Sequence, residues 1–313
     1  MAEAVYLQPG VSIDLTPTAA VTAGEVLAMP DGRAGFAPTA IAAGKKGALT
    51  VSGTVEVLKT ATMVMLKGSR LFWDHSANKA HLLQVNDEDF YLGIVQEDAA
   101  SAATTVKVNI NANPAYSIGL GDGFASLPIG ATTLTGGIIG HREGVSLMFD
   151  TKTEAQKFDA LSLVGVAPAC NCLVEALICV NDNGDAAAFD FNVGLADDTD
   201  ATDADTIAES LFIHIDGNDL NIFAESDDGA TQVAATNTTI DYVVGTPFLA
   251  QWDISDNTDI QLYINGVNVL AASVFKLNAA TGPLKLLAHL EKSSDDTPGS
   301  VTVMRLGLRI REE

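Results

Sequence analysis

Short runs of β-branched and aromatic residues recur along almost the whole chain, and clusters of glycine, proline or aspartate separate them. In the first half such runs include residues 54–58, 91–95 and 105–110. In the second half residues 211–215 and 301–310 place apolar side chains mainly on one side, as half-buried antiparallel strands do. No stretch sustains the ~3.6-residue period of an amphipathic helix. The sequence therefore predicts an all-β protein.

Three dipeptides predict tight turns between strands. Asp216-Gly217 and Asn265-Gly266 are the strongest short-range signals for a β-hairpin. Ser52-Gly53 is expected to join residues 48–51 and 54–58 into a further hairpin.

Length, glycine content and charge together predict two domains. A chain of 313 residues exceeds the usual ~100–200 residues of one domain. Eight of its 27 glycines fall within residues 119–144. Residues 1–144 carry 9 basic and 13 acidic side chains, a net −4, whereas residues 145–313 carry 8 and 27, a net −19. We therefore expect a domain over 1–115, a glycine-rich linker over 116–144 and a β-sandwich domain over 145–313.

The overall charge excludes two classes of partner. The formal net charge is −23, which repels phosphate backbones and anionic lipid, so we expect neither nucleic acid nor membrane as a partner. The N-terminus lacks a secretion signal, and Cys170, Cys172 and Cys179 are spaced unlike a zinc or redox motif. We expect synthesis in a reducing cytoplasm, with reduced thiols and no cofactor.

Five sequence blocks in the first half occur in the order found in one protein family. They are Gln8-Pro-Gly, Ala20-Val-Thr-Ala-Gly-Glu-Val, Ala40-Ile-Ala-Ala-Gly-Lys-Lys-Gly, Gly68-Ser-Arg-Leu-Phe-Trp-Asp and Leu92-Gly-Ile-Val-Gln-Glu-Asp-Ala. With Val106-Lys-Val-Asn-Ile they resemble the capsid cement, or head decoration, proteins of tailed bacteriophages over residues 2–112.

This resemblance implies a location and a partner. It implies a small β-barrel-like domain on the outer surface of an assembled phage head, bound to the major capsid protein. It further implies a homotrimer at local three-fold positions, without catalytic residues. The chain continues well past the end of the short members of the family.

The second half resembles lectin-type, laminin-G-like jelly rolls more loosely. Phe189-Asp-Phe-Asn-Val-Gly-Leu-Ala and the stretch from Trp252 to Val267 carry this likeness. It implies an antiparallel sandwich, and many such domains bind glycans whereas many do not.

Acidic stretches are the candidate metal and catalytic positions. The densest is Asp197–Asp205, where carboxylates in a loop could collect calcium, although the spacing differs from an EF-hand. We interpret it as a solvated acidic loop and predict no metal site. Glu225, Asp227 and Asp228 lack the carboxylate array of the sandwich glycosidases, so we predict no enzyme. The five histidines are scattered without a zinc motif and are expected to be structural or on the surface.

Two further candidates concern binding. Trp252 is expected in the core or in an interface. If its ring were exposed on a concave surface, it could stack on a glycan. The apolar segment formed by Val5, Tyr6, Leu7, Gln8 and Pro9 is the candidate capsid contact, because it could add to an exposed sheet edge; pairing within its own domain is equally open.

The sequence thus predicts a phage head decoration protein on the outer capsid surface of the virion, displaying an acidic β-sandwich. The alternative is a glycan-binding adhesin or fibre-like virion protein.

Overall fold

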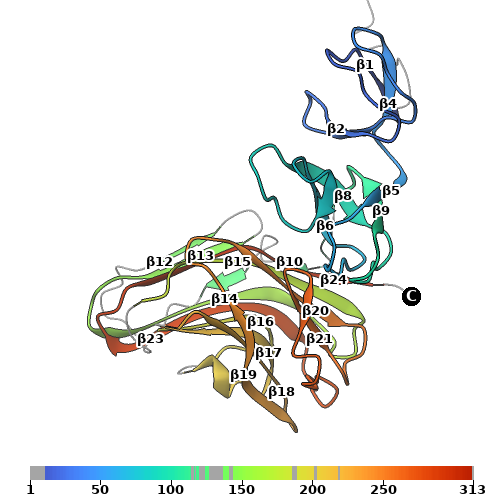
Figure 1. Cartoon of the computed structure of the whole chain (residues 1–313). Coiled ribbons are helices and arrows are strands. Elements are labelled where there is room, and N and C mark those ends of the chain that lie inside the picture. Colours follow the sequence, from blue (N-terminus) through green and yellow to red (C-terminus); the bar gives the residue numbers. More distant parts are fainter. Residues whose placement is uncertain are drawn as a thin grey trace, which may run out of the picture. The chain divides into compact units, whose positions relative to one another are not determined.

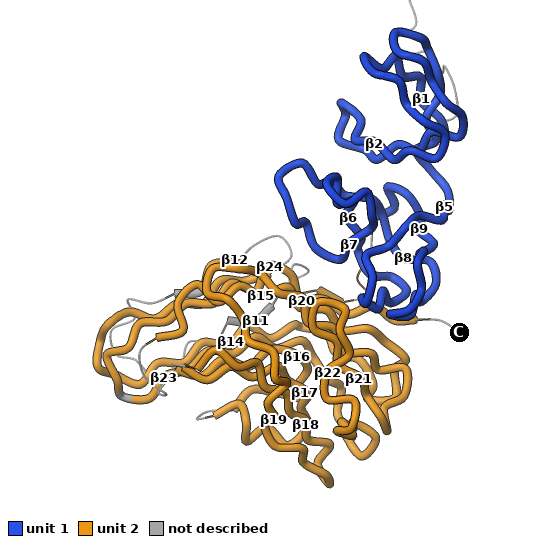
Figure 2. The backbone as a smooth tube through the Cα atoms, in the orientation of Figure 1, with its two compact units in different colours: residues 1–114 blue, residues 115–313 orange. Residues whose placement is uncertain are grey.

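The computed structural model describes residues 11–113, 116, 118–119, 124–126, 137–140, 144–184, 189–200, 203–217 and 219–311. These residues form strands, turns and one short 3-10 helix, which confirms the all-β prediction. The chain divides into two compact units, residues 1–114 and 115–313 (Figure 2). No helix within the described ranges is long and apolar enough to cross a membrane.

The first unit contains two small antiparallel sheets (Figure 1). The four-stranded sheet has the order β1-β4-β3-β2, with β1 (Ser12–Leu15), β2 (Val26–Ala28), β3 (Ala34–Phe36) and β4 (Gly47–Thr50). The five-stranded sheet has the order β5-β9-β8-β6-β7, with β5 (Thr54–Leu58), β6 (Arg70–Asp74), β7 (Lys79–His81), β8 (Phe90–Val95) and β9 (Thr105–Ile110). A single parallel bridge between Lys59 and Ala80 links the two edges of the latter sheet. Beyond this bridge no ladder pairs β5 with β7 among the described residues, so the expected barrel-like domain is an open arrangement and not a closed barrel.

The predicted hairpin at Ser52-Gly53 is wrong. Strand β4 pairs with β1 and β3, whereas β5 pairs with β9, so this turn leads the chain from one sheet into the other.

Asn111, which directly follows β9, connects the two sheets through its side chain. Its side chain accepts a hydrogen bond from Ala34 N at 2.9 Å and donates to Ala34 O and Val51 O at 2.8 Å each.

The second unit is a sandwich of two antiparallel sheets, as the sequence predicts (Figure 1). The eight-stranded sheet has the order β12-β13-β24-β15-β20-β21-β22, and β10 also pairs with β24. Its strands are β10 (Ile118–Gly119), β12 (Gly137–Gly140), β13 (Val145–Phe149), β15 (Cys172–Asp182), β20 (Phe248–Ile254), β21 (Gln261–Ile264), β22 (Val267–Val269) and β24 (Gly299–Ile310).

The seven-stranded sheet has the order β11-β14-β23-β16-β17-β18-β19. Its strands are β11 (Phe124–Ser126), β14 (Glu154–Val166), β16 (Phe189–Ala196), β17 (Glu209–Asp216), β18 (Asn221–Asp228), β19 (Gln232–Asp241) and β23 (Leu284–Asp295). The 3-10 helix η2 (Ala204–Thr206) lies between β16 and β17 in the chain.

Alternating side chains fill the space between these sheets. In β16, Phe189, Phe191 and Val193 are at most 1% exposed and belong to one large hydrophobic core, so the residues between them lie on the opposite face of the sheet. The predicted hairpin turn at Asn265-Gly266 is confirmed, since both residues have positive φ (49° and 77°) and connect the paired strands β21 and β22.

The glycine-rich stretch 116–144 contributes to this second unit wherever it is described. Strand β10 pairs with β24, β11 with β14, and β12 with β13.

Candidate functional site

A cluster of buried polar side chains lies on the face of the seven-stranded sheet that points away from the core. Cross-strand register sets out its central row: Asp159 of β14 pairs with His289 of β23, His289 with Asn192 of β16, and Asn192 with His214 of β17. A second row follows, in which Glu291 pairs with Asp190. We call the set below the Asp–His cluster. Its members are Asp159, Asp190, Asn192, Asp203, Asp205, His214, Glu225, His289 and Glu291.

Each imidazole in the Asp–His cluster bridges carboxylates. His289 Nδ1 is 2.7 Å from Asp159 Oδ1, and its Nε2 is 3.0 Å from Glu291 Oε2. His214 Nδ1 lies 3.1 Å from Asp205 Oδ1 and 3.4 Å from Glu225 Oε1. The two histidines are at most 3% exposed, so these contacts are shielded from solvent.

The protonation of the cluster follows from these contacts. Burial lowers the pKa of His289, but hydrogen bonds with its two carboxylate partners outweigh burial and raise the pKa to about 9. Burial likewise opposes the charged form of His214, yet its carboxylate partners hold its pKa far above the usual range. Burial raises the pKa of Asp190 to about 8, although the nearby His214 charge acts in the other direction. Near neutral pH both imidazoles are therefore cations, and Asp190 retains a proton.

A small apolar patch holds η2 against this face. Ala204 and Ile207 pack on Leu161, Phe212 and Leu287, together with Ala196. Asp203 caps the 3-10 helix by accepting a hydrogen bond from Asp205 N at 2.9 Å. The fold thereby brings Asp203 and Asp205 from the predicted acidic loop into the Asp–His cluster.

The other members of the acidic loop have different surroundings. Asp198 is exposed and accepts a hydrogen bond only from the adjacent Thr199 N among the bonds described. Asp227 and Asp228 serve the turn after β18, where they accept hydrogen bonds from the backbone of residues 229–231. Only Glu225 of that predicted acidic group reaches the cluster.

Sequence reasoning missed Asp190 and Glu291 as site residues, and it treated His214 and His289 as structural. One signal could have found Asp190 and Asn192. In the run from Phe189, large apolar residues alternate with Asp and Asn. The polar face of this strand therefore carries short acidic and amide side chains, which are mostly exposed in proteins unless they have partners.

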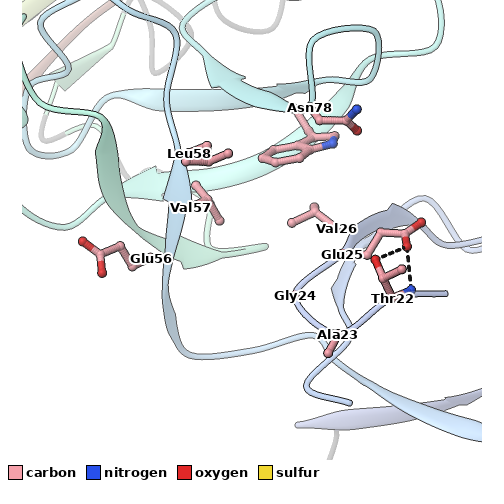
Figure 3. A pocket seen from close by; sticks show the side chains of 10 residues that line it. Thr22, Ala23, Gly24, Glu25, Val26, Glu56, Val57, Leu58 and Asn78 are labelled. Carbon is pink, nitrogen blue, oxygen red and sulfur yellow. Dashed lines mark hydrogen bonds between the residues drawn. The ribbon is translucent and has the colours of Figure 1, made fainter. Parts of the chain in front are cut away.

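The first unit holds a pocket of about 490 Å³ (Figure 3). Thr22–Val26 line one side of it, and residues 56–58, Trp73 and Asn78 line the other. Glu25 is held in place by hydrogen bonds from Thr22 N at 2.7 Å and Thr22 Oγ1 at 2.9 Å. Trp73 is 5% exposed, and its Nε1 has no hydrogen-bond partner among the described residues.

The two predicted binding features fare differently. Val5, Tyr6, Leu7, Gln8 and Pro9 lie outside the described residues, so the proposed capsid contact stays a prediction. Trp252 lies in the sandwich core and is 2% exposed. The ring of Phe275 packs edge-on against it, with 5.1 Å between the ring centroids. Its ring therefore offers no free face for stacking on a glycan, because core packing already covers it.

Comparison with solved structures finds similar chains with low sequence identity. The carbohydrate recognition domain of Emp47p matches with a TM-score of 0.43 at 9% identity, covering 60% of this chain and 89% of that one. A carbohydrate-binding module from Bacillus subtilis gives 0.37 at 8% identity, with 56% and 92% covered. An alginate lyase from Pseudomonas aeruginosa gives 0.39 at 12% identity, with 56% and 86% covered. No curated protein matches this sequence.

The family comparison concerns the first unit. Residues 7–110 match the model of the family described as phage cement protein, which is about a third of the chain. The match begins before β1 and ends with β9, so it takes in both sheets of the first unit. The first unit of this chain is therefore similar to the phage cement protein family over residues 7–110.

Proposed function

We propose that this protein decorates the outer surface of an assembled phage head and stabilises it. The observation that carries the proposal is the family match, which spans all nine strands of the first unit. A protein that binds the assembled lattice but not its free subunits stabilises the lattice by RT ln(1 + [L]/Kd) per site, about 4 kcal/mol at 1,000 Kd. Many such sites would offset the outward pressure of packaged DNA.

Charge supports binding through the first unit. Residues 1–114 carry 8 basic and 11 acidic side chains, a net −3, and can approach a protein shell, whereas residues 115–313 carry 9 and 29, a net −20, and are better placed in solvent. A homotrimer at three-fold and quasi-three-fold sites fits this role, because a plug at such a junction has to match its symmetry. The second unit would then project outward from the virion.

Within the first unit, the proposed contact arm is Val5–Pro9. It is mainly apolar, and Pro9 disfavours a central strand but is compatible with an edge. Such a segment can add to an exposed edge of a capsid sheet.

A binding role is favoured over catalysis and over an adhesin. Glu225 is committed to Asn192 and His214, and Asp227 and Asp228 support a turn, so none forms an open catalytic pair. The adhesin alternative, in which recognition by the second unit dominates, cannot use Trp252 as a stacking residue, because that ring is buried.

The test is co-sedimentation of the full chain with empty phage heads that lack their decoration protein, followed by electron cryomicroscopy. We expect binding to heads but not to free capsid subunits, and added density at local three-fold positions. A variant lacking residues 2–10 should lose head binding while its circular dichroism spectrum is unchanged. Density only at two-fold or five-fold positions would contradict the trimer, and equal binding to free subunits would contradict the stabilising role.

A further inference from the structure

Three carboxylates of the Asp–His cluster converge from separate parts of the chain. One oxygen each from Asp190 of β16, Asp203 at the start of η2 and Glu291 of β23 lies within 4.8 Å of the other two. Register explains the first contact, since Asp190 and Glu291 are direct neighbours across β16 and β23. The apolar seat of η2 brings Asp203 over the same point. All three side chains are partly exposed, which leaves a path from solvent.

Two buried imidazoles hold these carboxylates from behind. His289 Nε2 lies 3.0 Å from Glu291 Oε2, while its Nδ1 is anchored 2.7 Å from Asp159. His214 Nε2 is hydrogen-bonded to Asp216 Oδ1 at 3.0 Å and lies 3.6 Å from Asp190 Oδ1, so it acts on Asp190 through its charge. Partners of this kind, which contact the ligand oxygens but not the metal, orient the first ligands of metal sites.

Asn192 provides an independent indication that something is bound here. Its side chain is fully buried, and its Nδ2 donates to Asp205 Oδ1 at 2.8 Å and to Glu225 Oε1 at 2.9 Å, on the side of β17 and β18. Asp190 lies two residues before Asn192 on the same face of β16, so this amide is a neighbour of Asp190. The Asn192 Oδ1 accepts no hydrogen bond among the described residues, and the same holds for the buried Asp190 Oδ1. A fully buried oxygen with no donor calls for a partner such as a cation or a water bound to one.

Charge points in the same direction. Six carboxylates of the cluster face two imidazoles and the buried Lys157, whose Nζ is 3.4 Å from Asp159 Oδ2. A divalent cation among Asp190, Asp203 and Glu291 would offset most of the remaining negative charge. All three ligands are carboxylate oxygens, the donor type of hard cations. Three protein carboxylates suit Ca²⁺, which takes about six to eight oxygens in flexible geometry, better than Mg²⁺, which usually binds through one or two carboxylates and keeps several waters.

We propose that Asp190, Asp203 and Glu291 bind one Ca²⁺ ion on the outer face of the seven-stranded sheet. Water and the amide oxygen of Asn192, directly or through a water, complete the oxygen environment. The ion would tie β16 and β23 to the segment that carries η2, and so fix the acidic loop against the sandwich.

The test uses the full chain after treatment with a chelator and dialysis. Calorimetric titration with CaCl2 should give one ion per chain, and added Ca²⁺ should raise the melting temperature. Asp190→Asn should weaken Ca²⁺ binding by roughly 100-fold, since it removes a ligand and outer-sphere changes alone cost about 10–100-fold. Without Ca²⁺ this variant should melt no lower than the parent, because the amide occupies the same space as the carboxyl group and adds no charge to the crowded cluster.

Asp198→Asn is the matched control, because it removes one exposed charge from the same acidic loop outside the three ligands. It should keep the affinity within about two-fold, since a single exposed charge contributes little to a site it does not touch. Glu291→Gln repeats the test at a second ligand in case Asp190→Asn fails to fold. Equal losses in Asp198→Asn and the ligand variants, no saturable binding, or Mg²⁺ binding as tight as Ca²⁺ would overturn the proposal.

Discussion

At the scale of single residues, Glu175 in the second unit is a buried carboxylate that is paired with two arginines. It is fully buried in β15, and its carboxylate lies 2.6 Å from Arg305 Nε and 3.3 Å from Arg309, while Tyr116 donates a hydrogen bond at 3.0 Å. Burial alone would raise the pKa of Glu175, but Arg309 and Arg305 outweigh it and hold the pKa well below its usual range. The folded state therefore depends on an ionised Glu175.

We expect Glu175→Gln to destabilise the second unit by about 3–5 kcal/mol at pH 7, because it leaves two buried guanidinium groups without their anion. The folded pKa is depressed, so this contribution is complete above the unfolded pKa of about 4.3 and declines as the pH falls below it. Urea unfolding of both proteins at pH 7 and pH 3 measures the difference. A gap that stays constant over this range would show that the charge of Glu175 is not what stabilises the fold.

Asn111 in the first unit combines an unusual backbone with three hydrogen bonds. Its φ is 58°, a left-handed conformation that Asn tolerates better than other residues with a side chain. We expect Asn111→Ala to destabilise the first unit by about 3 kcal/mol, through backbone strain and through the lost bonds to Ala34 and Val51.

Asn111→Gly separates these two causes. It loses the same hydrogen bonds but adopts the left-handed backbone freely, so it should be more stable than Asn111→Ala by roughly 1–2 kcal/mol. Thermal unfolding of the two variants decides the matter. If they are equally stable, backbone strain contributes nothing at this position.

At the scale of elements, Gly93 lets β8 lie against β9. Its φ is +151°, and a Cβ at this position would lie 2.1 Å from the backbone oxygen of Asn109. We expect Gly93→Ala to cost about 3 kcal/mol or more, because the clash is with backbone that cannot move without breaking the sheet. Gly24→Ala is the control. The φ of Gly24 is +89°, but no neighbouring atom lies within 4 Å of a Cβ at this position, so the substitution should lower the free energy of unfolding by only about 1–2 kcal/mol. Chemical denaturation would resolve the difference between the two variants. Equal costs would mean that the close approach is relieved elsewhere.

Elements with strong local signals could be predicted from the sequence. The period-2 alternation of β16 and β17, and the Asn265-Gly266 turn, follow from side-chain direction and backbone sterics alone. The partner of β5 could not be predicted, because Ser52-Gly53 specifies a turn but not whether the chain returns to the same sheet. That choice depends on pairing with β9, which lies far along the chain.

The Asp–His cluster shows the same limit. Asp203 and Asp205 stood out because acidic residues are dense there, but Asp190 and Glu291 are isolated acidic residues in strands that are distant in sequence. Only the register between β16 and β23 makes them neighbours. A register of this kind is set by the whole sheet and leaves no mark in either strand by itself.

At the scale of the whole molecule, residues 115–144 bear on how the second unit can be isolated. Tyr116 packs its ring 4.6 Å from the Arg309 guanidinium, and β10, β11 and β12 extend the sheets of the sandwich. We expect a fragment of residues 115–313 to melt at least ~5 °C above a fragment of residues 145–313, since each 1 kcal/mol shifts the midpoint by about 2–4 °C at this size. Differential scanning calorimetry makes the comparison. Equal midpoints would support the linker that the sequence predicts.

The edge strands of the two sheets in the sandwich are short or irregular, which affects how neighbouring copies interact when many lie close together. Strands β11 and β22 each contain three residues and β12 contains four, while β19 departs twice from the register of β18. An edge so short or so irregular cannot template a continuous row of hydrogen bonds with a neighbouring molecule. Copies held at high local concentration on one shell would thus resist growing into shared sheets, and neighbouring particles would resist sticking to one another.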